Sequence, residues 1–175
     1  MRFMTITIFA ALLLAGCSSD SENLRCPAAA VLAPTSVLTV FRDGAPSDPS
    51  GELFTVWMSN VTTDCTAEKD SRSTDSTVTI KFQAKRAPSA EAANYKVPYF
   101  VTVTQGGDQI LTKKLFLAHF SFAPGEATTS FEDTIASTVI KITRGNKVGS
   151  YEILTGLQLT GEQLEYNRKM SHYAP

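Results

Sequence analysis

The sequence predicts an all-β protein: a single antiparallel β-sandwich of about seven strands, immunoglobulin-like or fibronectin-like, with a short C-terminal helix. Apolar and polar residues alternate with a period of two from Val37 onward, which is typical of half-buried strands. Clusters of Gly, Pro, Asp and Asn divide the chain into short segments, as in sandwiches. A closed barrel is the alternative that this pattern leaves open.

The clearest strand covers residues 77–85, where Val78, Ile80, Phe82 and Ala84 alternate with polar residues. The other segments with strand-like composition are 37–42, 52–63, 95–104, 109–119, 128–142 with an interruption, and 149–159. Seven strands result.

Turn chemistry refines this arrangement. The sequence Gly106-Gly107-Asp108 separates two predicted strands and tolerates positive φ, so those strands are expected to form an antiparallel hairpin. Pro98 lies inside the first of them and has no N–H to donate. We therefore expect Pro98 to mark an edge strand or a bulge.

The chain changes character near its C-terminus. Thr160 followed by Gln163 matches a capping box and predicts a short helix that ends at about Arg168 or Lys169. Residues 26–169 are expected to form one domain and 170–175 a frayed tail.

The N-terminus carries a predicted targeting signal. An apolar run follows Arg2 and closes on Leu14-Ala15-Gly16-Cys17, a lipobox, so residues 1–16 are expected to be a lipoprotein signal peptide. Lipidation of Cys17 would anchor the mature protein, with 17–25 as a polar tether. Ser18 rather than aspartate follows Cys17, which favours the periplasmic face of the bacterial outer membrane. An ordinary signal peptide with a chance cysteine is the alternative.

Charge and cysteine content limit the possible partners. The chain has 16 Lys and Arg against 17 Asp and Glu and no basic cluster, so nucleic acid is excluded as a partner. Besides Cys17 only Cys26 and Cys65 are present, and an oxidising compartment would join them in a structural disulfide. A metal site or reactive thiol pair is the less favoured reading.

No motif for catalysis, and no cofactor or metal site, is found in the sequence. His119 lies in a predicted strand and reads as a packed histidine, while Glu132-Asp133 reads as solvated rather than as a paired acid. Trp57 is odd-numbered, with Thr55 and Ser59, in the predicted strand 52–63, and Cys65 follows in the same segment, so Trp57 is expected to pack in the core near the disulfide. An enzyme is therefore not expected.

The triplet Arg25-Cys26-Pro27 follows the tether directly. Arg25 would lie near lipid headgroups or an acidic partner, and Pro27 has a fixed φ; a recognition role and a purely structural role are both open. Together with the lipobox, the triplet resembles the motif of the BamF family, small accessory lipoproteins of the alphaproteobacterial β-barrel assembly machinery.

Further segments resemble those of small alphaproteobacterial outer-membrane lipoproteins: residues 26–32, 41–44, 97–100 and 159–168. This wider resemblance implies no established activity. The resemblance to the BamF family implies a scaffold or accessory contact with the outer-membrane insertion machinery through Arg25, Cys26 and Pro27.

The expected function is thus that of a non-catalytic outer-membrane lipoprotein that acts as an accessory or scaffold protein in envelope biogenesis, with barrel-assembly subunits as its partners. The alternative is a periplasmic lipoprotein that binds a small molecule or glycan through aromatic residues such as Trp57, Tyr95 or Tyr99. A hydrolase would require His119 beside an acid in a cleft.

Overall fold

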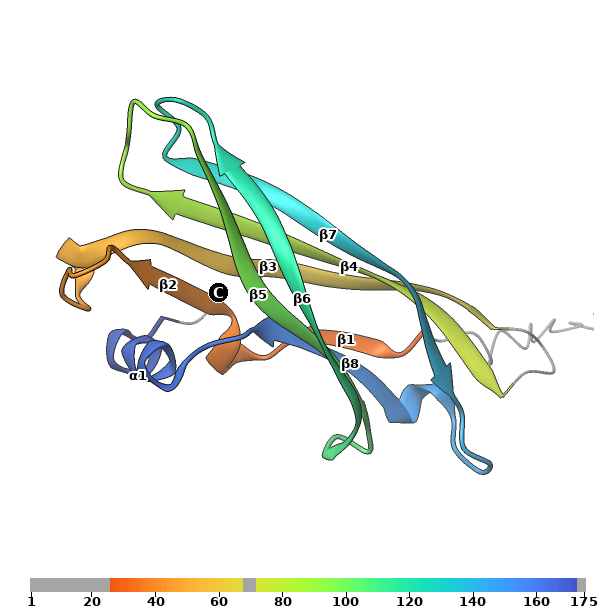
Figure 1. Cartoon of the computed structure of the whole chain (residues 1–175). Coiled ribbons are helices and arrows are strands. Elements are labelled where there is room, and N and C mark those ends of the chain that lie inside the picture. Colours follow the sequence, from red (N-terminus) through yellow and green to blue (C-terminus); the bar gives the residue numbers. More distant parts are fainter. Residues whose placement is uncertain (1–25, 68–71, 173–175) are drawn as a thin grey trace, which may run out of the picture.

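A computed structural model describes residues 26–67 and 72–172 and confirms the predicted all-β sandwich with a short C-terminal helix. Two four-stranded sheets form its layers, and β5 and β6 cross in front of β3 and β4 in Figure 1. The strands are β1 (Ala28–Val31), β2 (Val37–Phe41), β3 (Glu52–Ala67), β4 (Ser73–Arg86), β5 (Ala93–Gln105), β6 (Gln109–Phe122), β7 (Thr128–Lys141) and β8 (Tyr151–Leu157). The helices are α1 (Gly161–Met170) and three 3₁₀ turns, η1 (Ala33–Thr35), η2 (Pro49–Gly51) and η3 (Val148–Ser150).

The strand order is β1-β8-β5-β6 in one sheet, here called the β5 sheet, and β2-β3-β4-β7 in the other, the β3 sheet. Neighbouring strands run antiparallel except for β1 and β8, which are parallel. The predicted hairpin is present between β5 and β6, and Gly106 and Gly107 both have positive φ, 65° and 88°.

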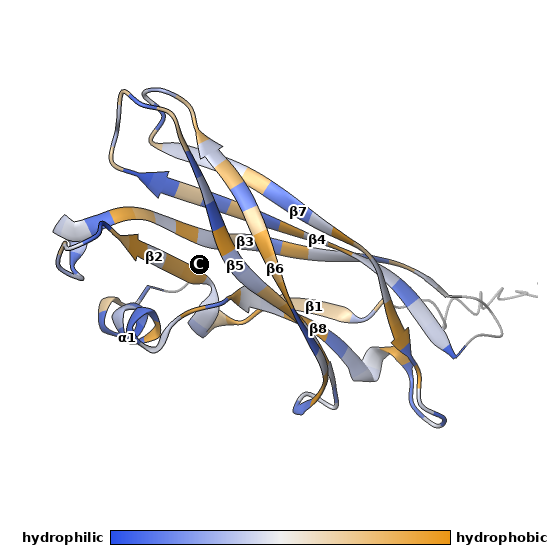
Figure 2. Cartoon of the chain, in the orientation of Figure 1, coloured by the Kyte–Doolittle hydropathy of each residue, from blue (hydrophilic) through white to orange (hydrophobic). Residues whose placement is uncertain are grey.

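The core lies between the two sheets and follows the predicted alternation. In β4 the side chains of Val78, Ile80, Phe82 and Ala84 are all at most 1% exposed. Figure 2 shows the corresponding apolar residues alternating with polar ones along the strands. Phe82 stacks on Phe131 of β7 with ring centroids 4.9 Å apart, so aromatic contacts also hold the edge of the β3 sheet.

The strand that the sequence does not predict is β1. Its sequence, Ala-Ala-Ala-Val, has no polar residue and hence no visible alternation. Pairing with β8 gives it strand geometry, with Ala29 opposite Ile153 and Val31 opposite Thr155. Ala29 and Val31 pack against the core, so tertiary contacts rather than β-propensity place this segment in the sheet.

The expectation that Trp57 packs in the core near the disulfide is wrong. Phe54, Val56 and Met58 of β3 face the core, so Trp57 points to the outer face, where it is half-buried. A bulge between Met58 and Asn60 shifts the register with β4, and beyond it the odd-numbered Val61 packs inward. One extra residue reverses the alternation, which is why Trp57 and Cys65 face opposite sides.

The expectation for Pro98 also needs correction, because β5 is an interior strand between β8 and β6. The ladder between β5 and β8 begins only at Tyr99, paired with Leu157, so Pro98 lies one residue beyond it. The Pro98 carbonyl still accepts from Gln158 N at 2.8 Å. In such an antiparallel pair the second bond would run from the N–H of residue 98 to the Gln158 carbonyl. Proline cannot make this bond, so it stands where the ladder between β5 and β8 ends.

The interruption expected within residues 128–142 is present in β7. Ser137 has a φ of 59°, and the pairing register of β4 with β7 shifts between Ser76 and Val78. This bulge keeps Ile135 and Ile140 packed on the core although their parity differs.

The capping box is formed as predicted: the Thr160 hydroxyl accepts from Gln163 N, and Gln163 Oε1 accepts from Thr160 N at 2.9 Å. The helix continues to Met170, slightly further than expected. It lies on the unpaired side of β2, where Asn167 Nδ2 donates to the Val37 carbonyl at 2.7 Å. The helix thus covers an edge that would otherwise be open to other strands.

Candidate functional site

The predicted site residues centre on the corner where the described chain begins. A disulfide joins Cys26 to Cys65 on β3, with their Cα atoms 5.5 Å apart, which confirms the predicted pairing. The Thr63 hydroxyl donates to the Pro27 carbonyl at 3.1 Å. The first described residues are therefore held on β3 by one covalent bond and one hydrogen bond.

The predicted binding triplet is Arg25-Cys26-Pro27, and the structure describes its last two residues. Cys26 is half-buried and Pro27 is buried, so both side chains are engaged with the protein itself. Cys17, the predicted lipidation position, and Arg25, the predicted charged contact, lie outside the described residues. Ala28 and Ala30 are exposed on β1. A partner at this corner would therefore meet alanine methyl groups and backbone rather than the proline ring.

An open hollow lies beside the same corner, between β1 and the bulge of β3. Its lining consists of small, apolar and neutral polar residues: Ala29, Ala30, Val31, Ala33, Ser36, Met58, Ser59, Asn60 and Val61. Asn60 is exposed at its rim and offers an amide that can both donate and accept. None of these residues titrates near neutral pH, so the hollow can accept a peptide-like group but has no group for proton transfer.

Asp133 is the acid that contacts a buried side chain of the core, Tyr99, and its role there is structural. Tyr99 is fully buried on β5, and its hydroxyl donates to Asp133 Oδ2 of β7 at 2.8 Å, which links the two sheets. Burial, and then the bond to Asp133, raise the pKa of Tyr99 well above its usual value. Glu132, the neighbour of Asp133, is exposed on the other face, so these two acids do not form a pair.

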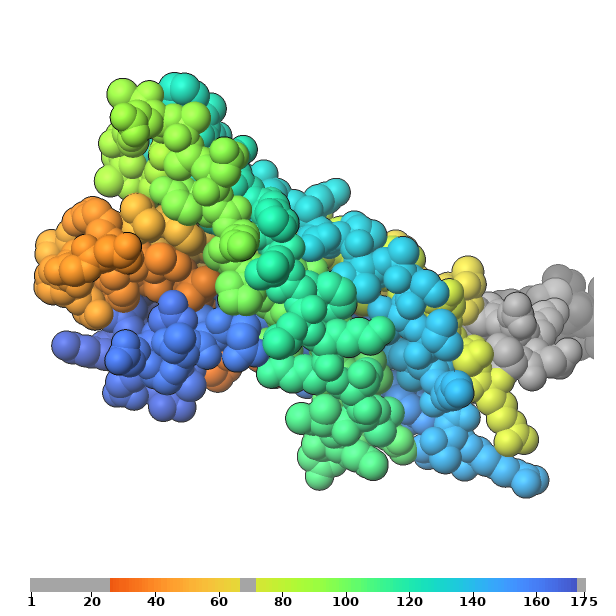
Figure 3. Space-filling view, viewed as in Figure 1, coloured from red at the N-terminus to blue at the C-terminus, as the bar shows by residue number. Residues whose placement is uncertain are grey.

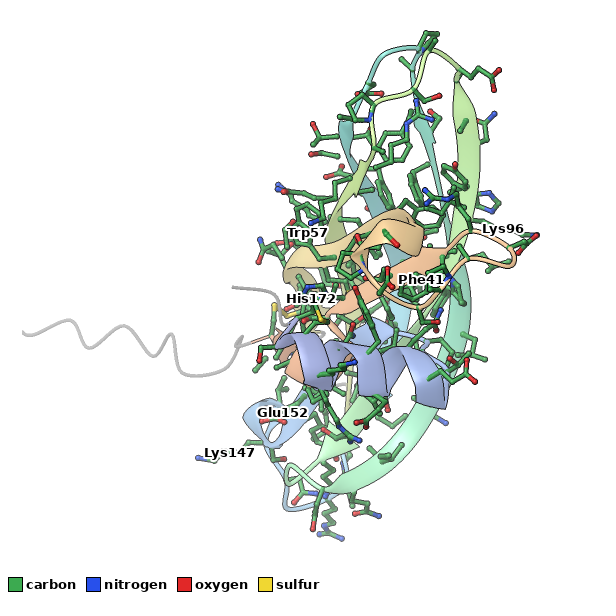
Figure 4. The ribbon with its side chains drawn as sticks, turned by 90° about the vertical axis from the view of Figure 1, so that its left-hand side faces the viewer. Phe41, Trp57, Lys96, Lys147, Glu152 and His172 are labelled. Carbon is green, nitrogen blue, oxygen red and sulfur yellow. A yellow bond between two sulfur atoms is a disulfide. The ribbon has the colours of Figure 1, made fainter. Side chains whose placement is uncertain are left out.

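The histidine that a hydrolase would need has no acidic partner in the described part of the chain. His119 is exposed on β6 and lies opposite Lys96, which also points to solvent (Figure 4). Within residues 26–67 and 72–172, no three His, Cys, Asp or Glu side chains are arranged to hold a metal ion.

The three aromatic residues proposed for a ligand occupy separate environments. Tyr99 is fully buried, and Tyr95 packs against Phe54 with ring centroids 4.4 Å apart. Trp57 lies on the outer side of β3, toward α1 and His172 (Figure 4). They do not line one common cavity, and none of them lines the hollow beside β1.

Sequence reasoning missed the hollow, because the parts of β1 and β3 that form it come together only in the folded chain. It also missed the exposed large apolar residues of the described chain, which are Ile110, Leu111, Leu115 and Leu117 on β6 and Val139 on β7; the first two directly follow the β5–β6 turn. An apolar pair that close to a turn was the available signal.

No helix in the described part of the chain combines the length and apolar character that crossing a bilayer requires. Comparison with protein-family models, with curated proteins and with solved structures finds no match to this chain.

Proposed function

We propose that this protein is a non-catalytic lipoprotein of the bacterial outer membrane that acts as an accessory or scaffold subunit in envelope biogenesis from the periplasmic face. The observation that carries the proposal is the disulfide between Cys26 and Cys65, which fastens the chain to the folded body directly behind the lipobox and tether. The eight residues 18–25 reach at most about 29 Å when fully extended. A lipid at Cys17 would thus keep the whole domain beside the membrane.

The residues that line the hollow beside β1 support a function in binding rather than in catalysis. The hollow beside β1 is lined by alanines, neutral polar groups and aliphatic side chains, which suits a peptide segment of a partner protein. Asn60 and the exposed face of β1 are the contacts that such a segment would meet.

The proposed partner is a subunit of the β-barrel assembly machinery, in line with the resemblance of Arg25-Cys26-Pro27. Because Cys26 and Pro27 are engaged with β3, Arg25 would supply the charged contact and the disulfide would hold it in position.

The test is affinity purification from native envelopes in mild detergent. We expect barrel-assembly subunits to co-purify with the wild type, and recovery to fall with Arg25→Glu. Arg168→Glu reverses an exposed arginine on α1 and serves as the matched control. Absence of every barrel-assembly subunit above background would remove the specific partner.

The anchor is tested separately with a fatty-acid probe. We expect the wild type to be labelled and Cys17→Ser to be unlabelled and released from membranes. An unlabelled wild type that fractionates like the variant would overturn the lipoprotein assignment.

A further inference from the structure

Two loops project from the end of the sandwich at which the described chain begins, and the paired ends of β3 and β4 lie at this end as well, next to the disulfide. Ala28, at the start of β1, pairs with Glu152, and the next residue of β8 toward that end, Tyr151, pairs with Gln105 at the end of β5. Gly106 N also donates to the Ser150 carbonyl at 3.0 Å. The β5–β6 hairpin and the β7–β8 loop therefore lie at the same end as Cys26, here called the N-terminal end, and they stand out from the body in Figures 1 and 3.

The hairpin carries exposed apolar side chains near its tip. Ile110 is 65% exposed and Leu111 is 44% exposed, although both directly follow the turn, and the exposed apolar residues continue along β6 with Leu115 and Leu117. Val139, near the end of β7, is 57% exposed. Figure 2 shows apolar segments near the tip of the hairpin and at the end of β7. Contact of these side chains with another apolar surface would remove from water an apolar area that folding leaves exposed.

The two projections carry mostly cations, whereas the acid Asp75 of β4 lies opposite Val139. Residues 105–114 and 141–150, which form the two projections, contain five cations and one acid, Asp108. The cations are Lys113, Lys114, Lys141, Arg144 and Lys147. All five are exposed, and none forms an ion pair with another described residue. Lys147 projects from the molecule into solvent (Figure 4).

The opposite end, here called the helix end, has the reverse charge. Its loops 42–51, 87–92 and 123–127, together with α1, contain six acids and three cations. The acids are Asp43, Asp48, Glu91, Glu126, Glu162 and Glu165. At the N-terminal end, the described residues of β3, β4 and β8 and the residue before β4 add Arg72 and the acids Asp64, Asp75 and Glu152. This end thus carries six cations and four acids, and the helix end three cations and six acids. An anionic surface would therefore attract the N-terminal end more than the helix end.

We propose that the N-terminal end docks on the headgroup layer of a bilayer that contains anionic phospholipids. Ile110 and Leu111 enter the boundary between headgroups and acyl chains, while Lys114, Arg144 and Lys147 bind lipid phosphates. Cys26 lies at this end and Cys17 is nine residues before it in the sequence, so this inference rests on the proposed lipid anchor. Docking would then orient the domain with α1 and the acidic loops directed away from the membrane.

The test uses the full-length chain produced in a Gram-negative host, with its acylation measured by mass spectrometry, and reconstituted into vesicles. An environment-sensitive fluorophore is attached at Leu111→Cys or, for the helix end, at Glu162→Cys. The vesicles contain phosphatidylcholine alone or with phosphatidylglycerol, and doxyl-labelled lipids act as quenchers.

We expect quenching of the probe at position 111 in anionic vesicles, and none at position 162. Arg144→Gln with Lys147→Gln should lower the equilibrium constant for tip docking about thirtyfold. The matched control is Arg168→Gln with Lys169→Gln at the helix end, which should leave quenching at position 111 unchanged. Circular dichroism checks that each variant keeps its strand content.

The outcomes separate this inference from the anchor. Quenching at position 111 in a chain that proves unacylated would support docking and overturn the anchor. An acylated chain whose probe stays in water, or is quenched equally in vesicles without phosphatidylglycerol, would overturn docking on anionic lipid and leave the anchor in place. Equal quenching at positions 111 and 162 would also overturn it, because the domain would then have no preferred orientation.

Discussion

The two terminal elements of the domain cover sheet edges in different ways. β1 extends the β5 sheet as a four-residue strand of three alanines and a valine, and a disulfide just before it ties it to β3. α1 lies on the open side of β2 without any covalent link, and its Tyr166 and Asn167 are buried. One terminus is held by a bond and the other by side-chain packing.

The difference follows from the area that each element can bury. Alanine side chains remove little apolar surface from water, so four residues of β1 gain little by docking. Tyr166 packs edge-on against Phe41 with ring centroids 5.0 Å apart, and its hydroxyl donates to Glu52 Oε1 at 2.8 Å. A terminal segment without a large side chain thus depends on a covalent staple, whereas one with a buried aromatic does not.

Removing the disulfide is the strongest test of this comparison. We expect Cys26→Ser with Cys65→Ser to lower the free energy of unfolding by about 4 kcal/mol, because the bond closes a loop with a sequence separation of 39. Urea unfolding measures the loss, and hydrogen exchange should show β1 amides opening before those of α1. If the variant unfolds at the wild-type midpoint, β1 is held by its own contacts and the comparison fails.

Gly156→Ala tests the non-covalent support on the β1 side. A Cβ at this position would lie 2.0 Å from Thr35 Oγ1 of η1 and 2.8 Å from Phe100 Cζ. We expect a loss of about 3 kcal/mol in the free energy of unfolding, because the Thr35 hydroxyl is held by its hydrogen bond to the Leu32 carbonyl and Phe100 is buried. Gly149→Ala is the matched control, since its Cβ would meet nothing within 4 Å. Equal stability of the two variants would mean that η1 does not seat tightly on β8.

Asn167→Ala tests the fastening of α1. The substitution leaves the Val37 carbonyl at the β2 edge without its donor. It also removes Asn167 Oδ1, which is buried and has no partner among the described residues. We expect a net loss of about 1 kcal/mol, measured by thermal unfolding. Glu165→Ala on the exposed face of α1 should change stability less. A loss as large as that of the disulfide variant would reverse the comparison.

The smallest expected effect concerns Tyr166 and pH. Burial, and then the hydrogen bond to Glu52, raise the pKa of Tyr166 to about 12. The folded state holds this proton above pH 10 whereas the unfolded state releases it, so the stability contributed by Tyr166 is complete below pH 10 and is lost as the pH rises toward 12.

We expect Tyr166→Phe to cost about 0.5 kcal/mol at neutral pH and to weaken the alkaline loss of stability. Urea midpoints between pH 7 and 11 measure the difference. Tyr99 contributes in the same direction in both proteins, so only the difference between them reports on α1. Parallel pH profiles would show that Tyr166 does not couple the helix to Glu52.

Much of the fold could be predicted because it rests on local interactions. The alternation of Val78, Ile80 and Phe82, the glycine turn between β5 and β6, and the capping box of Thr160 and Gln163 each depend on residues close in sequence. The pairing of Cys26 with Cys65 followed from the number of cysteines and the expected compartment. The lipid anchor at Cys17 stays a prediction.

Long-range contacts decided what the sequence could not show. A bulge beyond Met58 puts Trp57 and Cys65 on opposite faces of β3. The ladder between β5 and β8 ends next to Pro98, which lies in an interior strand. β1 is a strand because β8 offers it a partner.

By itself, then, the sequence determined the class of the fold, the helix start and the disulfide, because periodicity, capping and cysteine number act over short distances or by composition alone. Only the tertiary structure decided that the loops carrying Ile110 and Arg144 lie at the same end as Cys26, and that acids outnumber cations at the other end. Their positions depend on how β5, β7 and β8 align across the sheets, and no local pattern encodes that alignment.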